Sequence, residues 1–201
     1  MRTFASTPAP VHTLWDTPDM ATQRLPGVWW VKTPSHGGFV LSDERQAAMP
    51  EALRLESVYY EEDVNWTLVI LGFEAEFATL KDPHFDIERS IAHQTARHWL
   101  PHRYGAFTGQ MVTPSDSYVL KKVETVEAAI GEIGVRSAFG DWADWVPAGK
   151  VGVYGQRIAG CDHLGFTRYD GPEFKGLCDA AAYEAGRPVN TFAALGVELV
   201  S

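Results

Sequence analysis

The sequence predicts an α+β fold in which a mixed, largely antiparallel sheet packs with about three to four helices. Two observations support this fold class. Short runs of β-branched and aromatic residues, bounded by turn residues, are interspersed with segments of helical periodicity. These strands and helices do not follow the regular β-α-β order of a parallel sheet, so antiparallel pairing is favoured. The chain has 201 residues, of which 45% are hydrophobic, and can therefore bury a core.

The N-terminal part of the chain predicts an extended arm followed by a hairpin. Residues 1–27 contain four prolines among small polar residues, which indicates an arm that wraps the domain or frays. Residues 28–32 are dominated by bulky and β-branched side chains and predict a strand. The turn residues at 34–38 and the apolar run at 39–41 complete a hairpin.

Two helices and a buried strand are expected next. Ser42 is a good N-cap for a helix that runs to about residue 55 and is interrupted at Pro50. The apolar run 66–71 resembles a buried strand. Asp82 and Pro83 begin a second helix, which ends near residue 100.

The C-terminal half continues the mixed pattern, and we expect a single domain over residues 28–201. Residues 104–117 are rich in loop signals and form the best candidate for a flexible joint. The expected elements after it are a helix at 118–133, strands at 135–139, 149–158 and 164–169, a last helix at 173–184 and an edge strand at 197–200.

Composition narrows the function classes. The net charge is −9, which excludes a generally basic nucleic-acid coat and makes direct nucleic-acid binding the less favoured choice. The two cysteines, Cys161 and Cys178, are too few for a disulfide scaffold and fit a reducing compartment. No apolar run has the length of a signal peptide or a membrane span, so we expect a cytoplasmic protein without a membrane partner.

The hairpin tip is the first candidate site. Its residues are Ser35, His36, Gly37 and Gly38. The two glycines allow a ligand to approach the backbone, and their N–H groups could bind an anion. His36 is a candidate general base or metal ligand. The alternative is an ordinary turn with an exposed histidine.

The acidic run Glu61, Glu62 and Asp63 is the second candidate site. Its carboxylates could bind a divalent cation or act as an acid/base pair, with Glu61 and Asp63 on one face of a strand. The alternative is a solvated acidic loop. Residues 51–90 contain ten acids and three bases, so −7 of the net charge lies there and predicts a strongly negative surface where exposed.

A basic stripe on the second helix is the third candidate. Arg89, His93 and Arg97 are spaced four residues apart and therefore share a helix face. The stripe could hold a phosphate group. The favoured alternative is that it pairs with the acidic segment 51–90 of the same molecule.

The residues of the hairpin and the acidic run also carry a family resemblance. The sequence Thr-Pro-Ser-His-Gly-Gly at 33–38, followed by Arg45, Met49-Pro50 and the acidic run with Trp66, resembles an uncharacterised family of the DUF7007 type. The similarity is specific over about residues 28–75. Members of this family are carried on bacterial plasmids and phages, so the resemblance implies a mobile genetic element as the setting and assigns no activity.

Two function hypotheses follow. The first is an accessory protein of a mobile element that binds a host protein through the acidic surface, for example to occupy a defence nuclease or another DNA-binding factor. The second is a metal-assisted hydrolase or nuclease in which His36, Glu61 and Asp63 form the centre and Arg97 steadies a phosphate. Only this alternative implies a divalent cation, and it requires the hairpin tip and the acidic run to meet. The sequence leaves the oligomeric state open.

Overall fold

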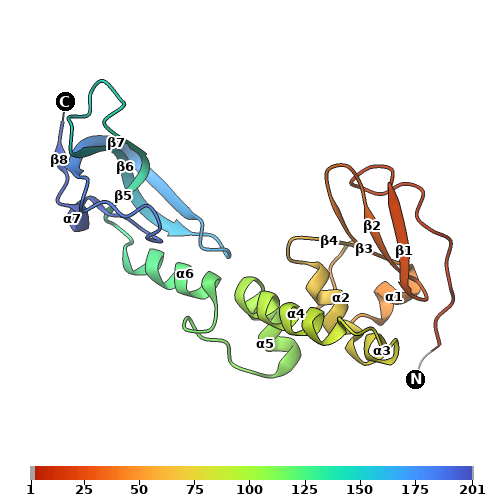
Figure 1. The fold of residues 1–201 in the computed structure, drawn as a ribbon. Coiled ribbons are helices and arrows are strands. Elements are labelled where there is room, and N and C mark those ends of the chain that lie inside the picture. The colour runs from red at the N-terminus through yellow and green to blue at the C-terminus, as the bar shows by residue number, and fades with distance from the viewer. Residues whose placement is uncertain (1–2, 201) are drawn as a thin grey trace. The chain divides into compact units, whose positions relative to one another are not determined.

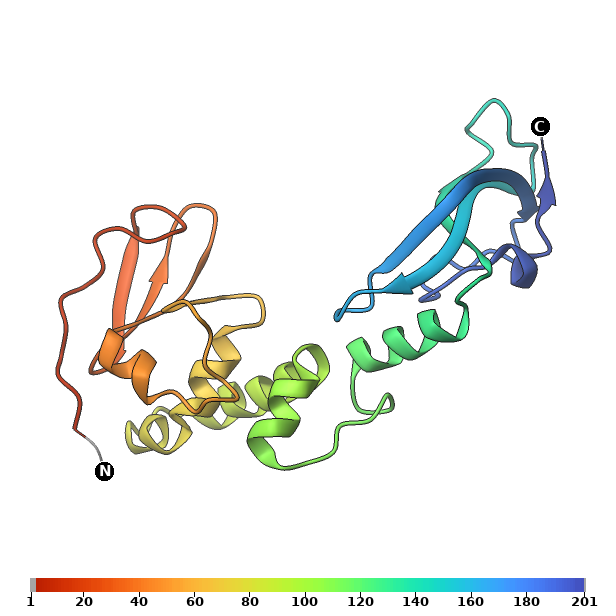
Figure 2. The same ribbon diagram turned by 180° about the vertical axis from the view of Figure 1, so that it is seen from behind.

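The structure is a computed structural model that describes residues 3–200. The chain divides into two compact units, an N-terminal unit (Met1–Val112) and a C-terminal unit (Thr113–Ser201), each visible in Figures 1 and 2. The division lies within the segment 104–117, which the sequence indicates as a joint. Residues 3–200 contain two antiparallel four-stranded sheets and seven helices, so the α+β class is confirmed and the helices are more numerous than expected.

The N-terminal unit contains the first sheet. Its strands are arranged in the order β1 (Met20–Leu25), β2 (Val28–Lys32), β3 (Gly37–Leu41) and β4 (Tyr59–Glu61), and all neighbours are antiparallel. The β2–β3 hairpin is confirmed. Strand β1 lies inside the expected extended arm. Its sequence carries little strand signal, and its pairing along β2 provides the hydrogen bonds that local propensity does not predict.

Residues 3–19 have no regular helix or strand but contact the rest of the unit. The ring of Phe4 is buried and lies 6.3 Å from the ring of Phe73. The indole N–H of Trp29 donates to Thr7 Oγ1 at 3.0 Å. Trp15 packs edge-on against Tyr59, with ring centroids 5.6 Å apart. This segment therefore contributes side chains to the packing of the unit.

Five helices complete the N-terminal unit. Residues 66–71, expected as a strand, belong to a helix, because an apolar run buried on all sides has the same composition in either conformation. The segment 104–117, expected to be rich in loops, begins inside another helix, whose first residue is Pro101. The helices are α1 (Asp43–Ala48), α2 (Trp66–Gly72), α3 (Glu74–Thr79), α4 (Phe85–Trp99) and α5 (Pro101–Thr108).

One continuous core joins the sheet and helices of this unit, and an arginine lies within it. The core includes Phe39, Leu68 and Phe77. Arg45, whose side chain is 1% exposed, forms two hydrogen bonds with Glu76 at 2.8 and 2.9 Å. Its Nε donates to the carbonyl oxygen of Pro26 at 2.7 Å, and its guanidinium lies 3.6 Å from the centroid of the Phe4 ring. The buried charge is thus fully paired.

The C-terminal unit contains the second sheet, with strands in the order β5 (Ile133–Phe139), β6 (Lys150–Cys161), β7 (Thr167–Asp179) and β8 (Glu198–Leu199). Its helices are α6 (Tyr118–Ala128) and α7 (Phe192–Leu195). The helix expected at 173–184 is wrong, since residues up to 179 continue strand β7. Pairing of β7 with β6 along most of its length outweighs the local helical pattern.

Candidate functional site

The hairpin tip is a turn closed by Thr33. Thr33 N–H and Thr33 Oγ1 both donate to the carbonyl oxygen of His36, at 2.8 and 2.7 Å. The N–H of His36 donates back to Thr33 Oγ1 at 3.1 Å. The side chains of Ser35 and His36 are exposed. The backbone is therefore fixed, while the imidazole is accessible to solvent.

The two glycines of the tip allow strand β4 to approach closely. Gly38 has φ +146° and lies opposite Glu61 in the β3–β4 register, where a side chain would collide with backbone atoms of Tyr60 and Glu61. A Cβ atom at Gly37 would lie 2.9 Å from a carboxylate oxygen of Glu62. The strand pairing therefore places the base of the hairpin tip beside the acidic run.

Within the acidic run, Glu61 caps the segment that leads into α2. Its carboxylate accepts the backbone N–H groups of Val64 and Asn65 at 3.0 and 2.8 Å, and also that of Asp63. Asp63 is exposed, and Glu62 is half-buried. Within residues 3–200, no three side chains of His, Cys, Asp or Glu form a cluster that could hold a metal ion. The carboxylate of Glu61 therefore has a structural role that the sequence did not indicate.

The basic stripe on α4 is largely paired within the unit. Glu74 forms an ion pair with Arg89, with 3.7 Å between Oε1 and the guanidinium. Its Oε2 lies 3.1 Å from Nε2 of His93. The other imidazole nitrogen of His93 lies 3.2 Å from the hydroxyl of Tyr104. Arg97 Nε is buried and has no hydrogen-bond partner among the described residues. For Arg89 and His93 the favoured interpretation holds, because their partner Glu74 belongs to the acidic segment 51–90.

The same pairing reduces the negative surface expected over residues 51–90. Glu76 pairs with Arg45 and Glu88 with Arg24, in addition to the contacts of Glu74 and the capping by Glu61. The acids of this segment whose side chains are exposed are Glu51, Glu56, Asp63, Asp82 and Asp86, and of these Asp86 pairs with Arg89 at 3.2 Å. The free negative charge is therefore more scattered than the sequence count indicates.

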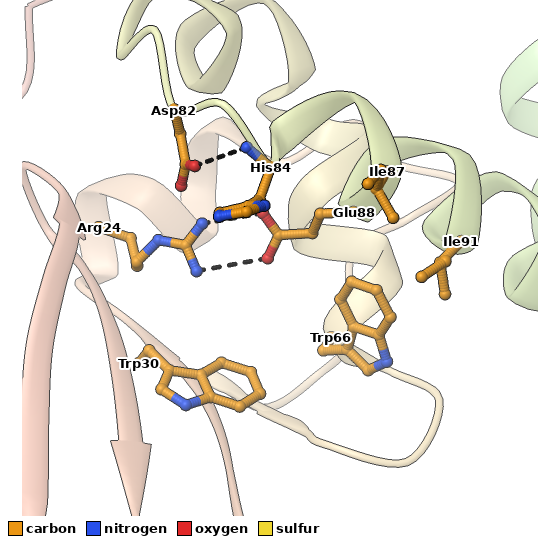
Figure 3. Close-up of a pocket in the computed structure, with 8 residues that line it drawn as sticks. All are labelled: Arg24, Trp30, Trp66, Asp82, His84, Ile87, Glu88 and Ile91. Atoms are coloured by element: carbon orange, nitrogen blue, oxygen red, sulfur yellow. Dashed lines mark hydrogen bonds and ion pairs between the residues drawn. The ribbon is translucent and has the colours of Figure 1, made fainter.

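A recess of about 470 Å³ opens in the N-terminal unit between the first sheet and helices α2 and α4 (Figure 3). Sequence reasoning did not identify this recess. Two signals were available: Trp66 lies in the family motif, and Ile87 and Ile91 are spaced four residues apart on one helix face, where they are 62% and 48% exposed. The lining residues are Arg24, Trp30, Trp66, Asp82, His84, Ile87, Glu88 and Ile91.

The lining of this recess has an apolar part and a charged part. Figure 3 shows Trp66 and Ile91 to one side of the Arg24–Glu88 pair. Asp82 and His84 lie above this pair and Trp30 lies below it (Figure 3). Arg24 and Glu88 form two hydrogen bonds at 3.3 and 2.9 Å, and both side chains are about one quarter exposed. The recess can therefore receive the apolar part of a ligand, while its charged residues can contact a polar group on the same ligand.

A further distinction concerns Asp82 in the charged part. Its Oδ1 accepts the backbone N–H of His84 at 2.9 Å, and it forms no ion pair with any described residue. Arg24, by contrast, is neutralised by Glu88. The recess therefore carries one carboxylate without a charged partner.

Comparisons with known proteins give one match. A family model described as a domain of unknown function, DUF7007, matches residues 8–130. No curated protein and no solved structure gives a significant match. Among residues 3–200, every helix is too short or too polar to be a membrane span.

Proposed function

Because the chain belongs to the DUF7007 family, whose description assigns no activity, we propose a function from the geometry: the N-terminal unit is a protein-binding module, and the recess receives a side chain of the partner protein. The observation that carries this proposal is the combination of two indole rings and two exposed isoleucines around one opening.

The lining of the recess has the anatomy of an interface. Energetically important residues at protein interfaces are enriched in tryptophan and lie in apolar pockets surrounded by a polar rim. Trp30 and Trp66 provide the aromatic surface, and Arg24, Asp82 and Glu88 provide the rim. Ile87 and Ile91 expose apolar surface to water, and a partner that covers them gains the corresponding burial energy.

The setting of a mobile element, implied by the family resemblance, makes a host protein the expected partner. In this proposal the exposed acids Asp63 and Asp82 steer a partner of complementary charge. A host nuclease or another DNA-binding factor offers such a basic surface. The recess then supplies the apolar contact that fixes the complex.

The test is affinity capture from lysate of the host cell after nuclease treatment. The bait proteins are the wild type, Ile87→Asp, and Val11→Asp as a matched control, because Val11 is 73% exposed and lies outside the recess. We expect a stoichiometric partner that the wild type and the control retain and that Ile87→Asp loses. Titration of the purified partner against all three proteins then confirms direct binding. Equal retention of the partner by all three baits would contradict the proposal.

One observation favours the second candidate function, a metal-assisted hydrolase or nuclease. The β3–β4 register places Gly38 opposite Glu61, so the hairpin tip with His36 and the acidic run with Asp63 are neighbours. Because Glu61 is engaged with backbone N–H groups, His36 and the exposed Asp63 are the two candidate ligands left, and residues 3–200 offer no cluster of three such side chains for a divalent cation. Hydrolysis assays with Mg²⁺ and Mn²⁺ on the wild type and His36→Ala test this candidate, and activity that His36→Ala retains would exclude it.

A further inference from the structure

We infer that the recess is selective for an amphipathic cation, and that the partner protein fills it with the side chain of an arginine or a lysine. This inference rests on the proposed function and names the residue type that the recess recognises. It follows from the walls of the recess, from the balance of charge around it and from its size.

The apolar walls suit a long aliphatic stem that ends in a positive charge. Arginine and lysine side chains lay their methylene groups along apolar surface while the charged head stays near water. Ile87 and Ile91 offer such a surface at the edge of the opening. A cation over the face of an indole is attracted by the ring, and tryptophan is the most favourable ring for this contact. Trp30 and Trp66 are both present in the lining.

The charges around the recess favour a cation over an anion. Arg24 is the one arginine or lysine in the lining, and its guanidinium is already bound by both carboxylate oxygens of Glu88. Asp82 adds a negative charge that no described residue neutralises by an ion pair. Arg24 and Glu88 neutralise each other, so the negative charge of Asp82 is the one left over among these three groups, and it attracts a cation and repels an anion.

The size of the recess is compatible with this occupant. A volume of about 470 Å³ lies in the range of sites that hold small organic groups, and it accommodates one long side chain together with part of the neighbouring backbone. The opening is lined by residues of α4 and by Arg24 of β1.

The test uses three small probes of similar shape and different charge: benzylamine as the cation, benzyl alcohol as the neutral probe and phenylacetate as the anion. Binding to the full chain is followed by NMR through the indole N–H resonances of Trp30 and Trp66. We expect the cation to bind about threefold or more tightly than the neutral probe, and the anion to bind most weakly, as expected of one partly exposed charge. Added salt should narrow the difference.

Three variants sharpen this test. Asp82→Asn should weaken benzylamine binding by about two- to fivefold and leave benzyl alcohol binding unchanged. Glu56→Gln, which removes an exposed carboxylate outside the recess, should change neither and serves as the control. Arg24→Met should strengthen benzylamine binding, because it frees the carboxylate of Glu88. N-acetyl-arginine amide and N-acetyl-norleucine amide, compared on the wild type, extend the test to the side chains themselves.

The outcomes separate this inference from the proposed function. Equal binding of the cationic and neutral probes, or tighter binding of phenylacetate, would overturn the selectivity for a cation. If Ile87→Asp nevertheless abolishes capture of the partner, the recess is a protein-binding site for an uncharged side chain and only the inference fails. If Ile87→Asp captures the partner as well as the wild type does, while benzylamine still binds selectively, the recess is a cation site. The proposal that a partner protein docks there is then wrong.

Discussion

The two units of this protein have the same secondary-structure class but are stabilised differently. The N-terminal unit has one continuous core that contains a fully paired arginine, Arg45. The C-terminal unit has two small clusters, one around Val153 and Phe192 and one around Val126 and Ile158. Its sheet depends on close contacts between side chains and glycines, as where Trp145 lies against Gly152. Similar elements are thus stabilised in one unit by a core that includes a paired charge and in the other by side chains packed directly on the glycines of a sheet.

The family match covers the N-terminal unit and stops before the second sheet. The matched residues 8–130 include every strand and helix of the N-terminal unit and α6, and they end before the second sheet begins at Ile133. Several residues of the motif that carries the family resemblance have structural tasks in that unit. Thr33 closes a turn, Arg45 joins four segments, and Glu61 caps the entry to α2.

The largest expected effect tests the buried arginine. Arg45→Leu leaves Glu76 and the carbonyl oxygen of Pro26 without their partner, so we expect a loss of about 4 kcal/mol in the free energy of unfolding. Arg157→Leu in the C-terminal unit removes an ion pair with Asp170 in which both side chains are about half exposed, and should cost less than about 1 kcal/mol. Denaturant titration followed by circular dichroism measures both. Equal losses would show that burial does not distinguish the two pairs.

A smaller effect tests the sheet of the C-terminal unit. Gly152→Ala would push a methyl group into the ring of Trp145. Because the ring or the strand has to shift, we expect the free energy of unfolding to fall by about 2 kcal/mol. Gly186→Ala is the control for the loss of backbone freedom, because Gly186 is exposed in a turn, has no positive φ, and an added methyl group there meets no atom. Hydrogen exchange should locate the destabilisation of Gly152→Ala in β5 and β6. Unchanged protection there would show that the Trp145 contact is not needed.

The acidic run provides a test of about 1 kcal/mol. Glu61→Gln weakens the acceptor of the N–H groups of Val64 and Asn65, whereas Asp63→Asn alters an exposed carboxylate that accepts no hydrogen bond from another described residue. We expect Glu61→Gln to lower the melting temperature and Asp63→Asn to leave it within error. A reversed order would restore Glu61 as a candidate ligand and remove its structural role.

The smallest expected effect is a pH dependence in the C-terminal unit. Backbone N–H groups of Phe166 and Leu164, which donate to Asp162, hold the pKa of this carboxyl below its ordinary value. A lowered pKa contributes stability above the pKa of the unfolded chain, near 4, and this contribution is lost as the pH falls through the folded value. Asp162→Asn should therefore make the acid side of the stability curve flatter. An unchanged slope below pH 4 would contradict this origin.

The local sequence pattern predicted those helices and strands in which the spacing of apolar residues matches the side that is buried in the fold. The β2–β3 hairpin, α4, α6, β5, β6 and the edge strand β8 all occur near the expected residues. The two wrong elements have a common cause. Residues 66–71 are apolar throughout and therefore show no period, and residues 173–179 pair with β6 against their local pattern. In both places tertiary contacts decide the conformation.

The candidate sites show the same limit. The hairpin tip and the acidic run were identifiable from residue types, but the task of Glu61 depends on where the next helix begins. The recess could not be predicted, because its lining comes from segments between Arg24 and Ile91 that only the fold brings together. Its strongest signal was the pair Ile87 and Ile91 on a helix whose core face is formed by Phe85, Ala92 and Ala96.

The ion pair between Arg24 and Glu88 has a consequence for the order of events during synthesis. Its partners are 64 positions apart in the chain. Because the ribosome adds about 5–20 residues per second, α4 is synthesised several seconds after β1. The β2–β3 hairpin can form within about 10 μs of emerging. Until the helices emerge, Trp30 can pack against Phe39 of the same hairpin but lacks the walls that Trp66 and α4 provide in the folded unit, so we expect a chaperone to act on the chain at this stage.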